Sequence, residues 1–493
     1  MIFQSFRFII FFGITTIAVF CVPRKWQNGV LLCFNLVFAY FAGGVKTLVF
    51  LSFSALTTFF SAIYISKSKS QRAKKTFFCI PFILNILLLV VLKYSAFFIK
   101  TTPEFIRLIV PVGISFYTLW MLGYLLDVYW NSYEAEKNFL NYAVFATYFP
   151  LIISGPIVRY QNTHEQFSKE RVLIADNVTK GILRVCWGFF QKMVIADNIA
   201  RIVNQIYSNH TQYTGVYILF GTVCFAIQLY TDFCGCIDIV LGCSKILGIN
   251  LPENFDAPFF SKSISEFWRR WHITLGTWFK DYLMYPLLKS RGMIALGDKS
   301  KKVLGKRIGK KIPVYCSLVV LWFSLGFWHG GAWKYIIGSG LLFCFYMIVS
   351  ESMTGIFKKT KSFLHINESI WWWKGFQTIR TFLLVCSGFV FFRSNGVRHA
   401  LNMYKNLCLP SNFFVAGFNS LLDDSNMSFM RFTVTCFSTA TLFMVSLVKK
   451  TNNNLSQKIY ENKVLTLILS LGLIGMIFLF AAIEKSSFIY FQF

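Results

Sequence analysis

The sequence predicts an all-α polytopic membrane protein. Of its 493 residues, 55% are hydrophobic and only 14% are charged, whereas soluble domains carry about 25% charged residues. Several apolar runs approach the roughly 20 residues that an α-helix needs to cross a bilayer. The basic residues, which outnumber the acidic ones 49 to 21, gather in short segments between those runs. Together these observations exclude an ordinary soluble domain.

The expected helices follow from the apolar runs in chain order. The runs cover residues 2–22, 77–92, 213–230, 312–328, 332–349, 382–392, 432–448 and 464–483. Some are shorter than a full span, so tilted, short or re-entrant helices are expected among them. Residues 149–160 carry Pro and Gly in an apolar run, which predicts a re-entrant element surrounded by protein or water. Residues 181–203 mix apolar and charged side chains, which suits an interfacial helix or one packed against a cavity.

The net charge of +28 is explained by membrane orientation and not by nucleic-acid binding. The basic segments are residues 24–25, 66–75, 289–311, 358–361 and 449–450. Short basic loops of this kind mark the cytoplasmic side of a membrane and favour anionic lipid headgroups. Counting the crossings between them predicts an external N-terminus and an external C-terminus.

No internal repeat or low-complexity linker divides the chain, so one integral domain over residues 1–493 is expected. Its core motifs lie in residues 111–350, and residues 371–493 supply additional transmembrane helices. The 13 cysteines include no CxxC pair. They are therefore interpreted as small hydrophobic side chains, and neither a disulfide framework nor a metal site is predicted.

A first candidate site residue, His272, lies in the tryptophan-rich stretch EFWRRWHITLGTWFKDYLMYP (266–286). On a helical wheel at 100° per residue, it falls with Trp268 and Trp271 on an aromatic arc, and the arginines fall on the other. The arginine face suits phosphate groups, because guanidinium forks bind them through paired hydrogen bonds. A core histidine in an aromatic-belt helix is the alternative interpretation.

A second candidate, His329, follows a run that would rise about 26 Å as a helix, far from the preceding basic loop. Between residues 312 and 349 the only charged residue is Lys334, and ionisable groups within a membrane are costly enough to indicate function. Gly330 and Gly331 would permit a close approach of another backbone or a substrate. Neutral imidazole accepts a proton near physiological pH, as a hydroxyl attacking an acyl carbonyl requires. A gap-filling histidine in a turn is the alternative, and the absence of GxSxG and P-loop motifs argues against a serine hydrolase or an ATP-driven pump.

Ordered motifs through much of the chain resemble the membrane-bound O-acyltransferases. The resemblance is to the bacterial branch of alginate O-acetyltransferases, peptidoglycan O-acetyltransferases and the D-alanyl transfer protein of teichoic acids. The motifs are PVGISFYTLWMLGYLLDVYW (111–130), FPLIISGPIVRY (149–160), QKMVIADNIA (191–200), YTDFCGCIDIVLGCSKILGINLPENFDAPF (230–259), residues 266–286, GFWHGGAW (326–333) and FVFFRSNGVRHALNMYKNL (389–407). The chain has Cys234 and Cys236 where the family commonly has serines, so a role that depends on those serines is not carried over.

The resemblance implies a ring of about 11 tilted transmembrane helices, with re-entrant and interfacial helices, around a thinned central tunnel. It also implies roles for particular residues: His329 and His272 in catalysis; Trp271, Trp328, Asp238, Asn254 and Asp281 in lining the tunnel or orienting groups; and Arg269 and Arg270 in donor binding.

The expected function is transfer of an acyl group, most readily acetyl, from a cytoplasmic thioester to hydroxyls of an exported polysaccharide or peptidoglycan. Acetyl-CoA is the expected donor, without a permanently bound cofactor or a metal. The expected setting is the bacterial cytoplasmic membrane, with membrane lipids, a surface polymer and an extracytoplasmic acyltransferase- or esterase-like partner, and without nucleic acid. D-alanyl transfer from a carrier protein to teichoic acid is the alternative, followed by a proton-coupled transporter and a non-catalytic scaffold.

Overall fold

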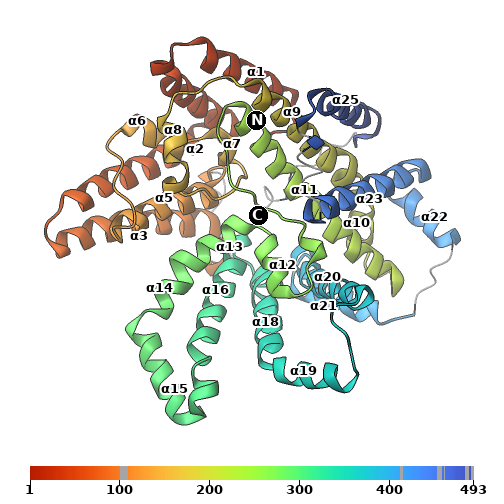
Figure 1. The fold of residues 1–493 in the computed structure, drawn as a ribbon. Coiled ribbons are helices and arrows are strands. Elements are labelled where there is room, and N and C mark those ends of the chain that lie inside the picture. The colour runs from red at the N-terminus through yellow and green to blue at the C-terminus, as the bar shows by residue number, and fades with distance from the viewer. Residues whose placement is uncertain (100–108, 411–414, 452–457, 460, 483–487, 490–493) are drawn as a thin grey trace. The chain divides into compact units, whose positions relative to one another are not determined.

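The computed structural model describes residues 1–99, 109–410, 415–451, 458–459, 461–482 and 488–489 (Figure 1). Its regular elements in these ranges are all helices, with one isolated β-bridge between Phe255 and Trp271. Eight helices of the described chain are long and apolar enough to cross a membrane: residues 24–67, 71–98, 216–246, 312–330, 333–352, 371–393, 429–451 and 463–480. The prediction of an all-α polytopic membrane protein is therefore confirmed. The ring of about 11 helices stays a prediction.

The N-terminal helices differ from the apolar runs read in the sequence. The first run forms α1 (Phe6–Cys21), whose 16 residues are fewer than those of the eight candidate spans. The following residues, which the list of apolar runs omitted, form the long helix α2 (Gln27–Lys67). Gly44 interrupts α2 with a φ of 73°, so two helices meet at this residue. Glycine adopts that conformation without the steric penalty of a side chain.

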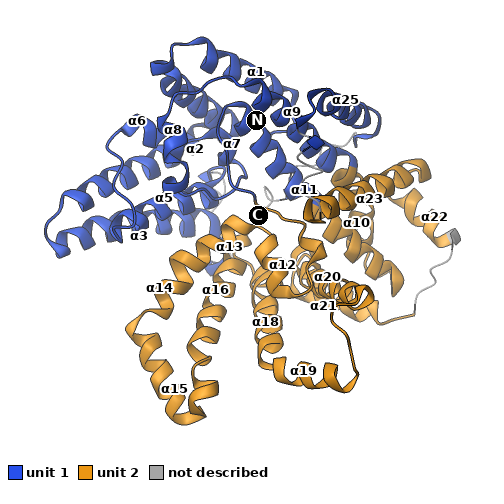
Figure 2. Ribbon diagram, in the orientation of Figure 1, with its two compact units in different colours: residues 1–194, 231–253, 454–493 blue, residues 195–230, 254–453 orange. Residues whose placement is uncertain are grey.

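The described chain forms two compact units (Figure 2). Unit 1 contains residues 1–194, 231–253 and 454–493, and unit 2 contains residues 195–230 and 254–453. The π-helix η2 (Gln191–Ala196) and the helix α11 (Val216–Ile246) contribute residues to both units. The prediction of a single domain over residues 1–493 stays a prediction.

Unit 1 is built around α5 (Ile114–Tyr129), in which every residue from Ile114 to Val128 is buried. The helices α2 and α3 (Gln71–Phe98) pack against it. The other elements of unit 1 are η1 (Arg24–Trp26), α6 (Phe139–Ala146), α7 (Phe149–Ile152), α8 (Tyr160–Ser168), α9 (Ala175–Phe190) and α25 (Lys463–Phe480). Residues 149–158 are all buried although α7 is only four residues long. The irregular backbone of this segment is therefore surrounded by protein, as predicted, and its re-entrant character stays a prediction.

The helix α9 approaches the second half of α11 closely through glycines spaced seven residues apart. A Cβ atom on Gly188 would lie 2.5 Å from the carbonyl oxygen of Gly235, and one on Gly181 would lie 2.8 Å from that of Gly242. On α11, a Cβ atom on Gly235 would lie 2.7 Å from the carbonyl oxygen of Gly188, and one on Gly242 would lie 2.7 Å from that of Gly181. Small residues of this kind let two helix backbones touch. Residues 181–194 lie in unit 1 and residues 195–203 in unit 2, and the interpretation of residues 181–203 as an interfacial helix or one packed against a cavity stays a prediction.

Unit 2 contains most of the C-terminal helices. Its elements are α10 (Asp197–Ser208), η3 (Pro258–Phe260), α12 (Ile264–Arg270), α13 (Ile273–Phe279), η4 (Lys280–Met284), α14 (Tyr285–Leu288), α15 (Arg291–Gly309), α16 (Ile312–Gly330), α17 (Trp333–Tyr335), η5 (Ile336–Leu341), α18 (Leu342–Ser352), α19 (Thr354–Phe363), α20 (Trp371–Arg393), α21 (Val397–Leu407), α22 (Val415–Asp424) and α23 (Phe429–Thr451). The segments η2, η4 and η5 are π-helical. Such widened turns occur often at functional sites.

Candidate active site

The first histidine lies at a break between two short helices of unit 2. The helix α12 ends at Arg270, and α13 begins at Ile273 after His272, which has a left-handed φ of 44°. The helical-wheel prediction assumed one continuous helix through this stretch and is wrong at that point. A non-glycine residue in this conformation is uncommon, so the surrounding structure must hold it there.

Asn254 holds this break in place. Its backbone oxygen accepts the N–H of Ile273 at 3.0 Å. Its side-chain oxygen accepts the backbone N–H of Thr274 at 3.1 Å and the Thr274 hydroxyl at 2.9 Å. The same oxygen lies 3.3 Å from Nδ1 of His272. The backbone N–H of Thr274 can only donate, so the side-chain atom of Asn254 that it meets must be the oxygen. Since this oxygen can only accept, Nδ1 of His272 must carry the hydrogen.

The second histidine lies at the end of the long helix α16. His329 precedes Gly330, the last residue of α16, and Gly331 adopts a φ of 58° while its N–H bonds the carbonyl of Phe327. Glycine is the residue best suited to such a helix C-terminus. The close backbone approach occurs at Gly326, where a Cβ atom would lie 2.7 Å from the Cα atom of Ile336. The π-helix η5 is thereby packed directly against the turn before His329.

Both histidines line one small cavity within unit 2. It has a volume of about 20 Å³, and its lining residues are Trp268, Trp271, His272, Leu275, Gly276, Trp322, Leu325, His329 and Ser339. A space of this size holds about one water-sized group. His272 and His329 are 3% and 7% exposed. The structure thus brings together two imidazoles that are 57 residues apart in the sequence.

Aromatic rings surround the two imidazoles. The ring centroid of Trp328 lies 6.1 Å from that of His272 and 5.4 Å from that of His329. The ring centroid of Phe392 lies 5.5 Å from that of His329. Trp271 lines the cavity and is 3% exposed. Trp271 and Trp328 therefore both lie beside the histidines, and of the two only Trp271 is among the residues that line the cavity.

The environment of His272 favours the neutral imidazole. Burial lowers the pKa of His272 well below its ordinary value of 6.5, and the nearby His329 lowers it further. Burial disfavours the charged form, and two neighbouring imidazoles repel each other when both are protonated. With Nδ1 donating to Asn254, Nε2 carries the lone pair of His272.

The two arginines beside the site differ in their surroundings. Arg270 forms ion pairs with Glu266 and with Asp256, each at 3.1 Å. Its charge is therefore already balanced by carboxylates, which weakens its predicted role in donor binding. Arg269 is exposed on the same short helix and remains a candidate for binding phosphate groups.

The structure adds basic residues that the sequence analysis did not connect with this stretch. Lys450, at the end of α23, donates to the carbonyl of Phe260 at 3.0 Å. Arg380, on α20, donates to the carbonyl of Lys262 at 2.9 Å. Two helices more than 100 residues further along the chain thus bring cations to the segment before α12. No local pattern signals this, although residues 449–450 were recognised as a basic segment.

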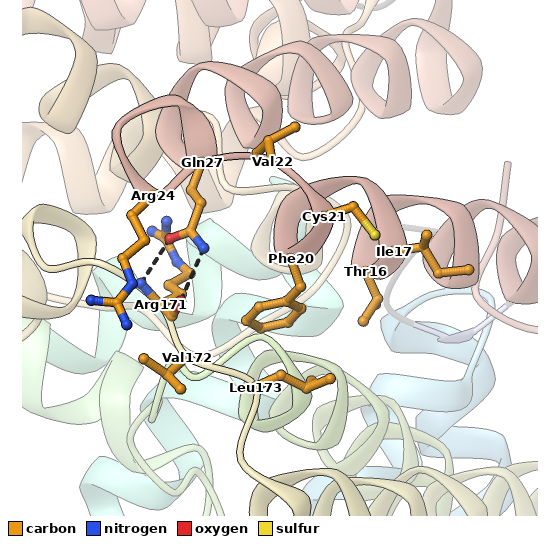
Figure 3. A pocket seen from close by; sticks show the side chains of 10 residues that line it. All are labelled: Thr16, Ile17, Phe20, Cys21, Val22, Arg24, Gln27, Arg171, Val172 and Leu173. Carbon is orange, nitrogen blue, oxygen red and sulfur yellow. Dashed lines mark hydrogen bonds between the residues drawn. The ribbon is translucent and has the colours of Figure 1, made fainter.

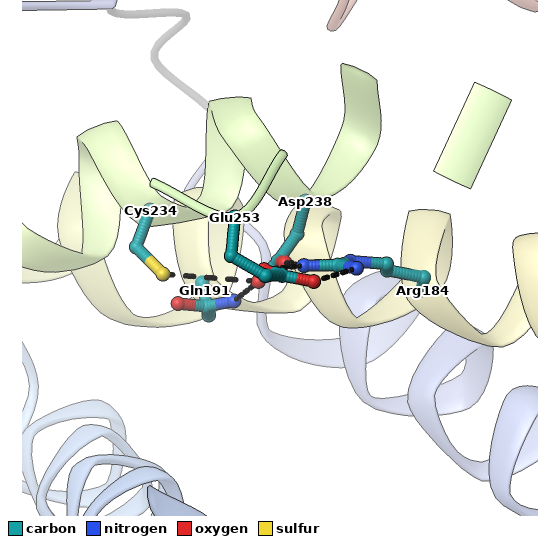
Figure 4. A network of polar contacts seen from close by, with 5 residues as sticks. All are labelled: Arg184, Gln191, Cys234, Asp238 and Glu253. Atoms are coloured by element: carbon teal, nitrogen blue, oxygen red, sulfur yellow. Dashed lines mark hydrogen bonds and ion pairs between the residues drawn. The ribbon is translucent and has the colours of Figure 1, made fainter. Parts of the chain in front are cut away.

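Asp238 belongs to unit 1 and takes part in a polar network there (Figure 4). Arg184 lies 2.9 Å from the Asp238 carboxylate and 2.5 Å from that of Glu253. Gln191 donates to Asp238 at 2.7 Å, and the Cys234 thiol lies 3.8 Å away. These partners give Asp238 a structural function in the packing of α9 against α11. Its predicted orienting role remains untested.

Asp281 lies on η4, in unit 2, and is half-buried. It does not line the cavity of the two histidines. Asn254, the other predicted orienting residue, is fully buried and contacts His272 directly. Of the three orienting residues that the sequence analysis proposed, the structure therefore supports Asn254 most strongly.

The comparisons with known proteins bear on the resemblance described above. Residues 133–297 match the model of the membrane-bound O-acyltransferase family. A peptidoglycan O-acetyltransferase of Helicobacter pylori is 29% identical over 96% of this chain and 92% of its own length. A probable alginate O-acetylase, AlgI, of Pseudomonas syringae pv. tomato is 34% identical over 60% of this chain. The chain spans about half of that relative's length, 52%.

A teichoic acid D-alanyltransferase of Bacillus subtilis is also similar to this chain. It is 28% identical over 80% of the chain and 99% of its own length, so this relative is the shorter protein. The predicted resemblance and the predicted O-acyltransferase activity are confirmed by these findings. The family match includes His272 and Asn254 and ends before His329.

Proposed function

We propose that this chain, a member of the membrane-bound O-acyltransferase family, transfers an acetyl group from a cytoplasmic thioester to hydroxyls of an exported surface polymer. The observation that carries the proposal is the cavity in which His272 and His329 share an aromatic wall. A buried imidazole is an effective general base for a hydroxyl nucleophile. The small volume of the cavity favours a short acyl group.

In the proposed reaction, His329 removes the proton of the acceptor hydroxyl as the oxygen attacks the thioester carbonyl. A carbon–oxygen bond forms, the carbon–sulfur bond breaks, and the departing thiolate takes up a proton to give the free thiol. His272 stays neutral, because its pKa is lowered by burial, and its Nε2 lone pair can accept a hydrogen bond from the acceptor. The aromatic wall limits the access of water, which would otherwise hydrolyse the thioester.

The donor in this proposal is acetyl-CoA, whose phosphates would be bound by basic residues at the segment before α12. Arg269 is exposed, and Lys450 and Arg380 are held near residues 260–262 by their contacts with backbone carbonyls. Cations gathered in this way favour a ligand that carries several phosphate charges. Arg270 contributes less, because Glu266 and Asp256 already balance its charge.

The acceptor side of the proposal follows from where the polymers lie. The acetylated polymer is outside the cell, so the chain would work in the bacterial cytoplasmic membrane. An extracytoplasmic acyltransferase- or esterase-like partner would complete the transfer. The similarity to the Helicobacter pylori protein over nearly the whole chain supports an acetyl acceptor such as peptidoglycan or another surface polysaccharide.

D-alanyl transfer to teichoic acid from a carrier protein is the second candidate. The similarity to the Bacillus subtilis D-alanyltransferase over almost all of that protein favours it. The chemistry at the histidines would be the same in both cases, since each donor is a thioester and each acceptor a hydroxyl. The two candidates differ in the acyl group that reaches the polymer.

The experiment is a measurement of base-labile esters on the cell-surface polymers, resolved as acetate and D-alanine. Cells carry the wild type, the His329→Ala variant or the control variant His365→Ala, whose histidine is exposed. We expect acetate to disappear with His329→Ala and to remain with His365→Ala, at equal amounts of folded protein. A loss of D-alanine instead would establish the second candidate, and unchanged esters would refute both.

A further inference from the structure

A groove in unit 1 combines a basic end with an apolar wall (Figure 3). It has a volume of about 460 Å³ and lies between the end of α1, the start of α2 and residues 171–173. Arg24, Gln27 and Arg171 form the polar part of its lining. Ile17, Phe20 and Leu173 form much of the apolar part. The proposed acyl transfer assigns no function to this groove.

Arg171 is the residue that indicates a ligand. It is 5% exposed. Its backbone N–H donates to the side-chain oxygen of Gln27 at 2.8 Å, and its backbone carbonyl accepts the side-chain N–H of Gln27 at 2.9 Å. Its Nη1 donates to the side-chain oxygen of Asn28 at 2.7 Å. Its Nε and Nη2 atoms are buried and have no hydrogen-bond partner among the described residues. A buried guanidinium with two open donors is unfavourable unless an acceptor is supplied. An anion that meets both donors would supply it.

The charge at the groove fits one negative ligand. Arg24 lies 3.1 Å from Glu170, and both side chains are more than half exposed. The two arginines and this one glutamate leave a net charge of one positive unit. The basic pair at residues 24–25 is also expected on the cytoplasmic side, where anionic headgroups attract arginine and lysine.

The apolar wall of the groove is open to its surroundings. Ile17 is 65% exposed, and Val172 and Leu173, which lie in a loop, are 53% and 52% exposed. Consecutive exposed apolar side chains in a loop indicate a surface that meets lipid or another apolar partner. Here they continue from the basic end of the groove, as the acyl chain of a lipid continues from its headgroup.

We propose that the groove binds one anionic glycerophospholipid. Its phosphodiester lies on Arg24 and Arg171, and an acyl chain lies along Ile17, Phe20 and Leu173. A free phosphate would use only the basic end and leave the apolar wall uncovered. A zwitterionic lipid would bring a cation next to Arg24, so a headgroup with a net negative charge is preferred.

The test is native mass spectrometry of the purified full chain in detergent. The probes are phosphatidylglycerol and phosphatidylcholine with identical acyl chains, and inorganic phosphate. We expect the wild type to retain phosphatidylglycerol about tenfold more than phosphatidylcholine, the ratio that about 1.4 kcal/mol of charge-assisted hydrogen bonding gives. The preference should fall to near unity in Arg171→Gln and in Arg24→Gln.

A matched control is Arg72→Gln, which removes an exposed arginine of the same unit and should leave the preference unchanged. If Arg171→Gln does not fold, Arg24→Gln decides, because the Arg24 side chain is 63% exposed. Equal retention of the two lipids by the wild type would overturn the proposal. So would a preference that survives Arg24→Gln, or displacement of phosphatidylglycerol by inorganic phosphate.

Discussion

Buried polar groups occur in both units, and their partners differ. In unit 1, Lys192 and Asp232 form an ion pair at 2.6 Å with both side chains 1% exposed. Asp232 also accepts the backbone N–H of Ile489 at 2.9 Å. In unit 2, His272 and His329 line the same cavity among aromatic rings. The pair in unit 1 therefore consists of opposite charges, whereas the pair in unit 2 consists of two bases.

This difference separates groups that hold the fold from groups suited to chemistry. An ion pair fixes the protonation state of both partners, because each charge favours the charged form of the other. Two neighbouring imidazoles do the opposite, since protonation of one disfavours protonation of the other. A proton can therefore move at the histidines without the rearrangement that it would require at Lys192 and Asp232.

The largest expected effect on stability comes from breaking the ion pair. Asp232→Ala would leave the Lys192 ammonium buried without its carboxylate, which destabilises a protein by about 3–5 kcal/mol. We expect the folded fraction in detergent to drop sharply, as measured by size-exclusion chromatography and thermal unfolding.

The double variant Lys192→Met with Asp232→Leu sharpens the test. Replacing both partners by apolar side chains removes the buried charge altogether, and such exchanges are often neutral or stabilising. The double variant should therefore recover most of the stability that Asp232→Ala loses. A double variant as unstable as the single one would mean that the pair acts through something other than charge.

The next effect tests the close packing on which the polar network of unit 1 depends. Gly188→Ala would place a methyl group 2.5 Å from a backbone oxygen of α11, which cannot move aside as a side chain would. Overpacking of this kind costs about 1–3 kcal/mol, so the unfolding temperature should fall. Gly13→Ala is the control, because a Cβ atom there meets nothing within 4 Å. Equal unfolding temperatures for the two variants would contradict the packing argument.

A smaller effect is expected at Asn254, which acts through His272 as a positioning residue. Asn254→Ala removes the acceptor that holds the hydrogen on Nδ1, so Nε2 is no longer reliably the basic nitrogen. We expect a loss of transfer rate of about tenfold, corresponding to about 1.4 kcal/mol. Asn254→Asp keeps the acceptor oxygen and should retain more activity than Asn254→Ala. Similar rates for these two variants would exclude control of the tautomer.

The smallest effect is a pH dependence of stability. The folded pKa of His272 is lowered, so below about pH 6.5 the unfolded chain takes up a proton that the folded chain does not. The stability of the folded chain that depends on a neutral His272 is fully present above pH 6.5 and is lost as the pH falls towards the folded pKa of His272. Between pH 7.5 and 5.5 the wild type should lose about 1 kcal/mol more stability than His272→Gln. Thermal unfolding at the two pH values measures it, and parallel losses would contradict the lowered pKa.

Seven of the eight candidate membrane spans of the described chain and both histidines could be predicted from local sequence, whereas α2 was missed. Apolar runs report helices because their length matches a bilayer, and His329 stood out because it interrupts such a run. The break at His272 was missed for a physical reason. It is held by Asn254, which lies 18 residues earlier in the chain. A helical wheel considers only the residues of one helix and cannot predict an effect of a side chain outside it.

Contacts between distant segments explain the other differences. Lys192 and Asp232 are 40 residues apart, and no pattern in either segment indicates that they pair. Arg171 lies in a short loop between helices, and its burial depends on Gln27 and Asn28, more than 140 residues away. Prediction from sequence thus succeeded where a signal is local and failed where a side chain depends on tertiary contacts.

The most direct test of the contrast between the two units is the rate of acetyl-ester formation on surface polymer. His329→Ala and the double variant Lys192→Met with Asp232→Leu are compared at equal amounts of folded protein. Loss of a general base reduces rates by about 10²–10⁴-fold, so His329→Ala should be at least about a hundredfold slower with an unchanged unfolding temperature. The double variant should retain most of the wild-type rate. An active His329→Ala variant would contradict the catalytic function assigned to the histidines. A folded but inactive double variant would contradict the structural function assigned to the ion pair.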